Sequence, residues 1–308
     1  MIGVVIKSTG KRYTVKTSDG ELIECRLKGK FRIKQIKSTS PIVVGDSVEL
    51  QRESELWIIS QIFNRRNQII RKSVNLSKKT HIIAANIDQA ILMITLNSPV
   101  TTTGFIDRFL VSANAYGIEV ILLLNKIDLL NDKMICQRDS LQKVYEEIGY
   151  KFISLSVIKD DLEPIKKLMQ DKINMIAGHS GVGKSTLINK LQPGLSINTN
   201  QVSVTHKQGQ HTTTFSELYD LDFGASIIDT PGIRGFGLVE LVPNEISNYF
   251  PEFFALRANC KFHNCIHRDE PGCKVKLALE EKKIAVSRYK NYLTMLNEEQ
   301  VHYRINDY

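Results

Sequence analysis

The chain has 308 residues, 42% hydrophobic and 24% charged, a composition that is ordinary for a globular protein and excludes a disordered or fibrous one. No apolar run approaches the roughly 20 residues that cross a bilayer, and the N-terminal residues lack the layout of a signal peptide. We therefore expect a cytoplasmic monomer with no membrane contact. The formal net charge is +8, and residues 1–72 carry all of that excess, with 15 Lys and Arg against 7 Asp and Glu.

The first 70 residues predict short β-strands separated by turns. Five segments are rich in branched apolar residues: "GVVIKS", "RYTVKT", "ELIECRL", "IVVGDSVEL" and "ELWIISQIF". Strands at this spacing predict a small closed barrel, either the favoured OB-type barrel or an SH3-like one. The local basic charge favours a nucleic-acid partner, because each Lys or Arg on a phosphate releases a counterion. A merely soluble basic domain is the alternative. The basic stretch "RRNQIIRKS" is predicted as a linker.

From about residue 80 the pattern changes to strands that alternate with helices. "QAILMITL", "IEVILLL", "KFISLS" and "INMIAG" predict buried strands, and helices are predicted over 104–117, 136–149 and 161–171. This alternation predicts a parallel, doubly wound α/β sheet. After "DTPGIRGFG" the sequence becomes mainly helical, with a helix predicted over 276–297. We expect three domains: a barrel at 1–70, an α/β domain at 71–235 and a helical domain at 236–308.

The stretch "GHSGVGKST" follows a predicted strand and matches the complete P-loop pattern. Its glycines permit a tight loop whose backbone N–H groups face phosphate oxygens, while Lys184 supplies positive charge and Ser185 a hydroxyl ligand for Mg²⁺. A glycine-rich turn without function is the alternative, and the strand–loop–helix context disfavours it. The predicted phosphate-binding residues are Gly178, His179, Ser180, Gly181, Val182, Gly183, Lys184, Ser185 and Thr186.

"IIDTPG" supplies the next part of a nucleotide site. Asp229 ends an apolar strand and is predicted to hold Mg²⁺, and the Gly232 N–H to reach a γ-phosphate. The pattern D-x-x-G alone is a weak indication of a nucleotide site, but about 45 residues after a P-loop it is a strong one.

"NKID" is predicted to select the base. The Asp128 carboxylate can accept two hydrogen bonds from guanine that adenine does not offer, which favours GTP over ATP. Asn125 and Lys126 are expected to brace the loops and cover the ring. A surface turn is the alternative, but NKID ends a buried strand, where α/β sheets place ligand contacts. Ser156 and Val157 occupy the place of a loop behind the guanine, on a short match.

"GQHTTT" lies between these two motifs, where a switch loop is expected. Thr213 is the first choice for a magnesium ligand that depends on the γ-phosphate, Thr212 is the second, and Thr214 is not separable from them. Ile233, after D-x-x-G, has no polar group to orient water, so His211 is the candidate for orienting or deprotonating it. The predicted catalytic residues are thus His211, Lys184 and Thr213. The alternative for His211 is a contact to phosphate or RNA; either way we expect a low intrinsic rate that depends on a partner.

Cys260, Cys265, His267 and Cys273 form a dense cluster in the last quarter of the chain. Three thiolates and one imidazole fill a tetrahedral shell, so we predict one structural Zn²⁺ with no open position for catalysis. Unligated thiols are the alternative reading of the cluster, and His263 is the rival imidazole ligand.

NKID precedes the P-loop by about 50 residues, whereas an ordinary P-loop GTPase has the reverse order. A parallel sheet brings ligand loops together at its strand ends in either order, so a circular permutation resolves the conflict. With the barrel, the HTTT loop, DTPGIR and the Cys-x4-Cys-x-His-x5-Cys tail, the chain resembles the circularly permuted, small-ribosomal-subunit-dependent GTPases known as RsgA, YjeQ or YloQ. Gln210 departs from the basic residue that this family often shows there.

The resemblance implies an OB-fold, a permuted GTPase domain and a zinc domain. It implies binding of GTP, GDP and Mg²⁺, and GTP hydrolysis stimulated by the small ribosomal subunit and its ribosomal RNA during late subunit maturation. The implied roles are Asn125, Lys126 and Asp128 for guanine, Gly178 to Thr186 for phosphates, and Cys260, Cys265, His267 and Cys273 for zinc. Two alternatives are a GTPase that acts on a protein partner and an RNA-binding module whose nucleotide site is only structural.

Overall fold

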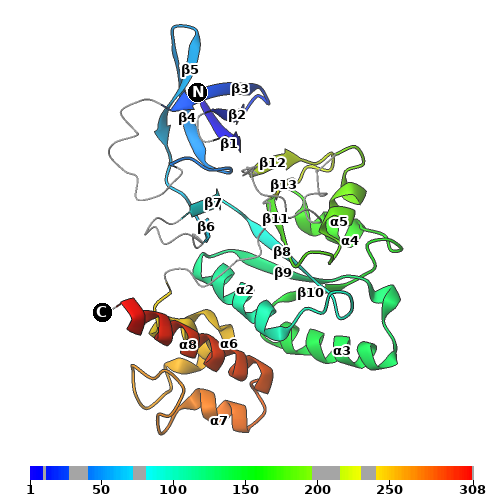
Figure 1. Ribbon diagram of the computed structural model, residues 1–308, viewed down its shortest axis with the longest axis vertical. Helices are drawn as coiled ribbons and strands as arrows, with labels where there is room; N and C mark the ends of the chain where they lie inside the picture. Colours follow the sequence, from blue (N-terminus) through cyan, green and yellow to red (C-terminus); the bar gives the residue numbers. More distant parts are fainter. Residues whose placement is uncertain (10–11, 28–40, 72–80, 196–215, 230–240, 307–308) are drawn as a thin grey trace, which may run out of the picture.

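The computed structural model describes residues 1–9, 12–27, 41–71, 81–195, 216–229 and 241–306. Figure 1 shows three parts: a barrel that holds the N-terminus, a central sheet flanked by helices, and a helical unit that ends in α8 at the C-terminus. Among the described helices, none combines the length and apolar character of a membrane span.

The N-terminal part is a closed barrel of five strands. They are β1 (Ile2–Ser8), β2 (Tyr13–Thr17), β3 (Leu22–Leu27), β4 (Ser47–Glu53) and β5 (Leu56–Ile62). The order is β1-β2-β3-β5-β4, and β4 closes the barrel on β1. Alternate residues such as Tyr13 and Val15 point into the barrel core. This confirms the predicted OB-type barrel. The segment "IVVGDSVEL" is a strand only from Ser47, because Gly45 turns the chain with φ 90°.

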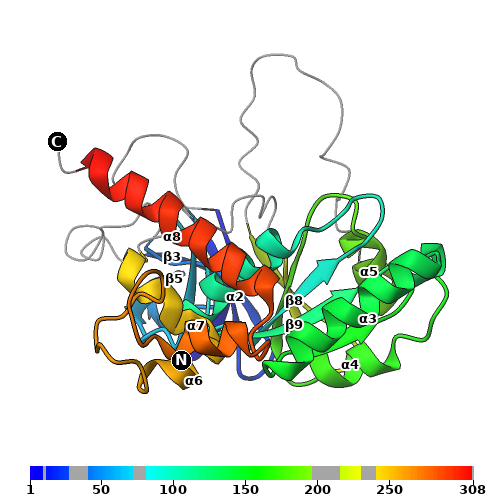
Figure 2. The same ribbon diagram turned by 90° about the horizontal axis from the view of Figure 1, so that it is seen from below.

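The central part is a mostly parallel sheet in the order β10-β9-β8-β11-β13-β12, in which only β12 is antiparallel to its neighbour. Its strands are β8 (Gln89–Ile94), β9 (Glu119–Leu124), β10 (Lys151–Ser154), β11 (Ile173–Ala177), β12 (Glu217–Asp220) and β13 (Ser226–Asp229). Helices α2 (Thr103–Ala115) and α3 (Asp132–Glu147) pack on one face, and α4 (Glu163–Met169) and α5 (Lys184–Leu191) on the other. Figure 2 shows these two layers from below. The predicted doubly wound sheet is therefore confirmed.

The barrel is joined to the sheet through a small hairpin. β6 (Gln68–Arg71) pairs with β7 (His81–Ala85), so part of the predicted linker is a strand, because it finds a partner ten residues on. Gly45 of the barrel approaches β7 so closely that a Cβ there would lie 2.0 Å from the Ala85 carbonyl oxygen. Only glycine fits at this contact.

The described C-terminal part consists of three short helices and one long helix, α8, and contacts α2 through α8 and η2. These helices are η2 (Pro243–Tyr249), α6 (Pro251–Arg257), α7 (Lys274–Glu280) and α8 (Val286–Asn306). The prediction of one helix over 276–297 is wrong: the chain breaks after α7, where Lys282 takes a left-handed φ of 61°. The turn allows Ile284 to reach the core of this unit. The apolar pattern on both sides of the break is helical, which explains the error.

A buried polar network fixes this unit to the central part. The guanidinium of Arg288 on α8 donates to Asp107 of α2 at 2.6 Å and to Glu252 of α6 at 2.8 Å. Its ring contact with Phe250 adds a cation–π interaction at 4.4 Å. Burial alone lowers the pKa of Arg288, but the two carboxylates outweigh it and raise that pKa. The guanidinium therefore stays charged inside the protein.

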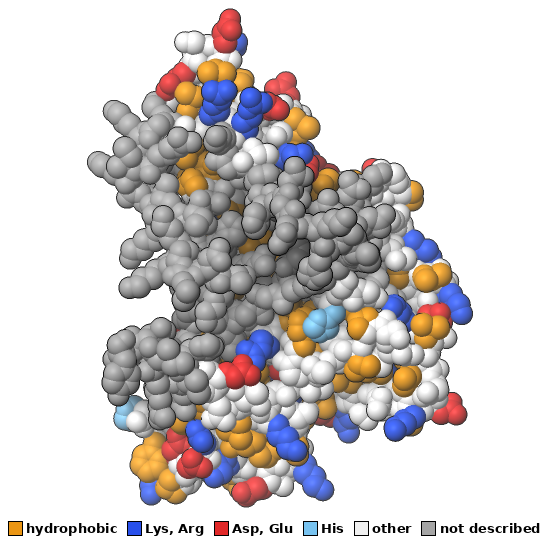
Figure 3. Space-filling model, viewed as in Figure 1, with side chains coloured by type: hydrophobic (Ala, Val, Ile, Leu, Met, Phe, Trp, Pro, Cys, Tyr) orange, Lys and Arg blue, Asp and Glu red, His pale blue; other side chains and the backbone are white. Residues whose placement is uncertain are grey.

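Of the basic residues that give the first quarter its charge, seven lie outside the described residues: Lys11, Lys28, Lys30, Arg32, Lys34, Lys37 and Lys72. On the face in Figure 3, the described Lys and Arg side chains are interspersed with Asp and Glu. The prediction of a polyanion partner for the barrel thus depends on residues that are largely not described.

Candidate functional site

Three loops that follow strands of the central sheet meet at one site. NKID follows β9, Ser156 and Val157 come soon after β10, and the P-loop follows β11. The strands are parallel, so their carboxyl ends lie along one edge of the sheet, where such folds bind ligands.

Asn125 ties these three loops together. Its Nδ2 donates to the carbonyl of Val182 in the P-loop at 2.8 Å. Its Oδ1 accepts from the backbone N–H of Lys126 at 2.7 Å and of Val157 at 2.9 Å. The side chain is 4% exposed, so its polar atoms are satisfied by protein rather than by water. Asn125 therefore joins the P-loop, the NKID loop and the loop after β10 through protein hydrogen bonds.

The approach of Asn125 also determines which residue can occupy position 183. A Cβ on Gly183 would lie 2.4 Å from Asn125 Nδ2, and this glycine has a φ of 106°. Both the space and the backbone conformation thus require glycine. Through this contact, Asn125 of NKID restricts the residue type that the P-loop can have at position 183.

Lys126 clamps two loops over the site. Its Nζ donates to the carbonyl of Gly181 in the P-loop at 2.7 Å and of Ser98 at 2.6 Å. Its backbone is left-handed, with φ 64°. Ser98, which follows β8, is a site neighbour that the sequence did not indicate, because its contribution is a backbone carbonyl.

The carboxylate of Asp128, predicted to read the base, lies beside Ser156 and Lys159. A hydrogen bond from the Ser156 side chain is the main cause that lowers the pKa of Asp128, and Lys159 contributes through its ammonium, 3.6 Å from Oδ2. The Ser156 backbone N–H is held by Asp160 at 2.7 Å. The carboxyl is therefore ionised at neutral pH and can only accept hydrogen bonds, as guanine recognition requires. Sequence reasoning missed Lys159.

The P-loop leads from β11 into α5, which begins at Lys184. Lys184 Nζ donates to the carbonyls of Gly178 at 2.8 Å and His179 at 2.7 Å, which holds the ammonium over the loop. Ser185 and Thr186 lie in the first turn of the helix, whose N-terminal N–H groups favour an anion. The local geometry is suited to binding phosphate.

The other predicted residues are placed only in part. Asp229 is the last residue of β13, next to β11, so its backbone lies at the same edge of the sheet as the P-loop. Gly232, Ile233, His211 and the threonines 212, 213 and 214 lie outside the described residues.

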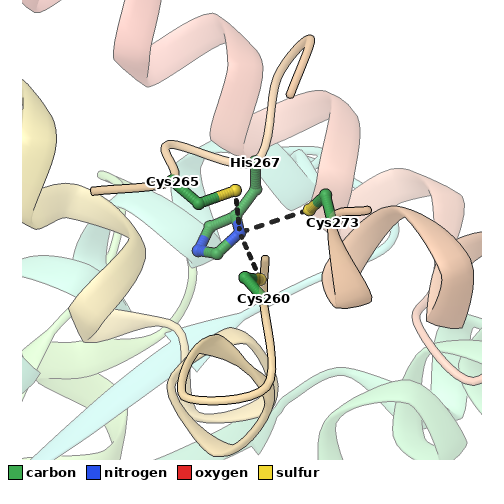
Figure 4. Close-up of side chains that lie close together, drawn as sticks. All are labelled: Cys260, Cys265, His267 and Cys273. Carbon is green, nitrogen blue, oxygen red and sulfur yellow. Dashed lines mark hydrogen bonds between the residues drawn. The ribbon is translucent and has the colours of Figure 1, made fainter. Parts of the chain in front are cut away.

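The second candidate site is the cysteine cluster (Figure 4). The Nδ1 atom of His267 faces the sulfurs of Cys265 at 3.4 Å, Cys273 at 3.4 Å and Cys260 at 3.7 Å. Zinc bonds of about 2.0 Å to nitrogen and 2.3 Å to sulfur at a tetrahedral angle separate these atoms by roughly 3.5 Å. The four side chains therefore have the spacing of a tetrahedral metal site. His263 is exposed and stands outside the group.

The surroundings of the cluster hold its loop in shape. Glu270 accepts the backbone N–H groups of Ile266 at 2.7 Å and Arg268 at 2.9 Å. The Tyr289 hydroxyl donates to the His267 carbonyl at 2.8 Å, which links the loop to α8. Burial raises the pKa of Cys265 to about 12, because removal from water destabilises the charged thiolate and the neighbouring cysteines add to this effect. A divalent cation reverses this effect, which fits a metal-binding role.

The comparisons with known proteins agree with this geometry. A family model described as the RsgA GTPase matches residues 62–239, and one described as the RsgA N-terminal domain matches residues 2–56. Proteins named small ribosomal subunit biogenesis GTPase RsgA include one from Flavobacterium johnsoniae, 55% identical over 100% of this chain and 96% of its own length. Another, from Bacteroides fragilis, is 49% identical over 97% of both chains.

Two solved structures extend the likeness to the whole fold. The crystal structure of YjeQ from Thermotoga maritima superposes with a TM-score of 0.81 at 33% identity, and covers 97% of this chain and 98% of its own. YloQ, described as a circularly permuted GTPase, gives a TM-score of 0.78 at 29% identity over 98% of this chain and 95% of its own. The chain, with NKID ahead of its P-loop, therefore belongs to the RsgA family of circularly permuted GTPases.

Proposed function

We propose that this GTPase binds the small ribosomal subunit, assists its late maturation, and hydrolyses GTP to GDP and phosphate faster on that subunit. The observation that carries the nucleotide part is the set of Asn125 hydrogen bonds, which joins the NKID loop to the P-loop and to Val157 in one site. The partner is supported by the printed names of relatives that match the full chain.

Each part of the site has a role in this proposal. Asp128 reads guanine, with Ser156 behind it and with Asn125 and Lys126 bracing the loops. The residues from Gly178 to Thr186 cradle the phosphates, and Lys184 neutralises their outer charge. Ser185, Asp229 and Thr213 would hold Mg²⁺, and the backbone N–H of Gly232 would donate to the γ-phosphate. The chemistry that Mg²⁺ supplies is charge neutralisation on the β- and γ-phosphates.

His211 is proposed to orient the attacking water, because Ile233 occupies the place where many GTPases have a polar side chain. Removing the imidazole in His211→Ala should retain GTP binding and lose the stimulated hydrolysis. Full stimulated activity in this variant would reject the role, and a parallel loss of GTP affinity would indicate a phosphate contact instead.

The cysteine cluster is proposed to hold one structural Zn²⁺ through Cys260, Cys265, His267 and Cys273. Its donor set and spacing support this, and four protein ligands leave no position for a substrate. We further propose that residues 1–70, 71–235 and 236–308 act as barrel, GTPase domain and zinc domain. In the GTP form the first and last contact ribosomal RNA, and hydrolysis releases the protein as a monomer.

The test measures GTP hydrolysis by the purified protein alone and with small subunits, large subunits or free RNA. We expect small subunits to stimulate hydrolysis, and large subunits and free RNA not to do so. Stimulation by free RNA to the same level would favour a general RNA-dependent enzyme. Binding of GTP without hydrolysis under every condition would favour a structural nucleotide site.

A further inference from the structure

The first turn of α2 meets the P-loop at one ring contact. The rings of Phe105 and His179 have centroids 3.8 Å apart, with planes inclined by 33°. Phe105 also packs against the hydrophobic core beneath α2, so it is held from behind. Burial, followed by the charge of Lys184, lowers the pKa of His179, which keeps the imidazole neutral and suited to an apolar neighbour.

His179 in turn holds the lysine of the P-loop. Its backbone carbonyl accepts the hydrogen bond from Lys184 Nζ at 2.7 Å. That carbonyl, together with the carbonyl of Gly178, orients the ammonium, and the ring contact restrains the residue that carries it. Phe105 therefore reaches the proposed phosphate site through a single intervening residue.

The same turn of α2 is held on its other side by α8. Asn291 of α8 donates to Asp107 Oδ2 at 2.6 Å, and Arg288 donates to Oδ1 at 2.6 Å. A Cβ on Gly104 would lie 3.5 Å from Asn291 Oδ1, so the two helices are in contact at this point. Figures 1 and 2 both show α8 alongside α2. The turn thus lies between the P-loop and the C-terminal unit.

We propose that Phe105 is a positioning residue that links the orientation of Lys184 to the packing of α8 on α2. The inference rests on the nucleotide site proposed above and deepens it. It implies that contacts made by the C-terminal unit change the affinity for the outer phosphates, although this unit holds none of the proposed nucleotide ligands.

The first experiment compares full-length variants by their dissociation constants for GTP and GDP. Phe105→Leu keeps an apolar side chain and loses the ring, so both nucleotides should bind about 3- to 10-fold more weakly, the worth of one aromatic pair. Phe105→Tyr keeps the ring and should restore binding to within about twofold. Phe109→Leu is the matched control, because Phe109 is buried in the same helix, and it should lower the melting temperature without changing affinity.

The second experiment is a double-mutant cycle with Asn291→Ala, which removes one α8 contact to α2. Asn291→Ala should weaken GTP binding in the otherwise unchanged chain and have little further effect in Phe105→Leu. Additive effects, or a Phe105→Leu variant that behaves like Phe109→Leu, would overturn the inference and leave the nucleotide site standing. Absence of GTP binding by the unchanged protein would instead overturn the site itself.

Discussion

The nucleotide site and the cysteine cluster are both assembled from distant loops, but different forces hold them. In the nucleotide site, protein groups satisfy one another: Asn125 alone makes three hydrogen bonds that join three loops. In the cluster, three thiols face one imidazole nitrogen, and burial raises the pKa of Cys265 and of Cys273. The first arrangement is held by hydrogen bonds between protein groups, whereas the second has the donor set of a cation site. Ligand removal should therefore affect the two regions very differently.

The largest effect is expected at the proposed zinc site. Cys273→Ser removes a buried residue that is proposed to bind zinc, and structural zinc contributes apparent binding free energies of about 10 kcal/mol, comparable with the stability of a whole domain. We expect loss of stoichiometric zinc and unfolding of residues 241–298, measured by metal release and limited proteolysis. Cys136→Ser, at an exposed position of α3, is the control. Retained zinc and an unchanged melting curve in Cys273→Ser would contradict a stabilising metal ion bound through this residue.

A smaller loss is expected from Asn125→Ala in the nucleotide site. The change leaves the Val157 N–H and the Val182 carbonyl without their partner, at about 1–3 kcal/mol for each buried group. GTP affinity should fall by about 100-fold while the fold persists. Asn131→Ala is the matched control, because Asn131 caps α3 nearby and its loss should lower stability by about 1 kcal/mol without changing affinity. Equal GTP affinity in both variants would mean that nucleotide binding does not depend on the hydrogen bonds of Asn125.

Asp128→Asn leaves the loops in place and alters only the group that is proposed to read the base. The amide can no longer accept both guanine hydrogen bonds, so the affinity for GTP should fall by about 10- to 100-fold. The affinity for xanthine nucleotides should rise. Competition of XTP against labelled GTP measures this shift. Unchanged selectivity for GTP would contradict the proposed role of Asp128 in recognising guanine.

The smallest effect concerns the reactivity of the two thiols outside the cluster, whose labelling should leave the fold intact. Burial, with a contribution from Glu24, raises the pKa of Cys25 to about 12, so this thiol stays protonated and unreactive at pH 8. With zinc bound, a thiol reagent should label Cys136 alone, since the cluster sulfurs are occupied. Chelation should expose the three cluster cysteines as well. Rapid labelling of Cys260 before chelation would argue against a bound ion.

Local patterns predicted most of the fold. Branched apolar runs such as "IEVILLL" form β9 as expected, and Gly117 ends α2 with a left-handed φ of 66°. The prediction failed where a distant contact decides the outcome. Residues 68–71 are a strand because they pair with β7, and the predicted helix over 276–297 breaks so that Ile284 can reach a core made by other helices.

The site shows the same division. P-loop, NKID and cysteine spacing are local motifs, so residue types and order were sufficient to predict these candidates. The contributions of Ser98, Phe105 and Arg288 are not readable from sequence, because one is a backbone carbonyl, one a ring contact and one a buried ion pair across two helices. Each depends on which elements the topology places side by side.

The junction between barrel and sheet has a consequence for solubility. β12 is the last strand on its side of the central sheet, and β1 pairs with it at Lys7 and Glu217. An open strand edge is a template for pairing with another chain, so we expect the barrel to reduce self-association of the GTPase domain through this edge. Lys7 and Lys16 reinforce the cover through ion pairs with Glu217 and Asp220. A chain without residues 1–62 should scatter more light as its concentration rises, and a monodisperse one would show that the edge needs no cover.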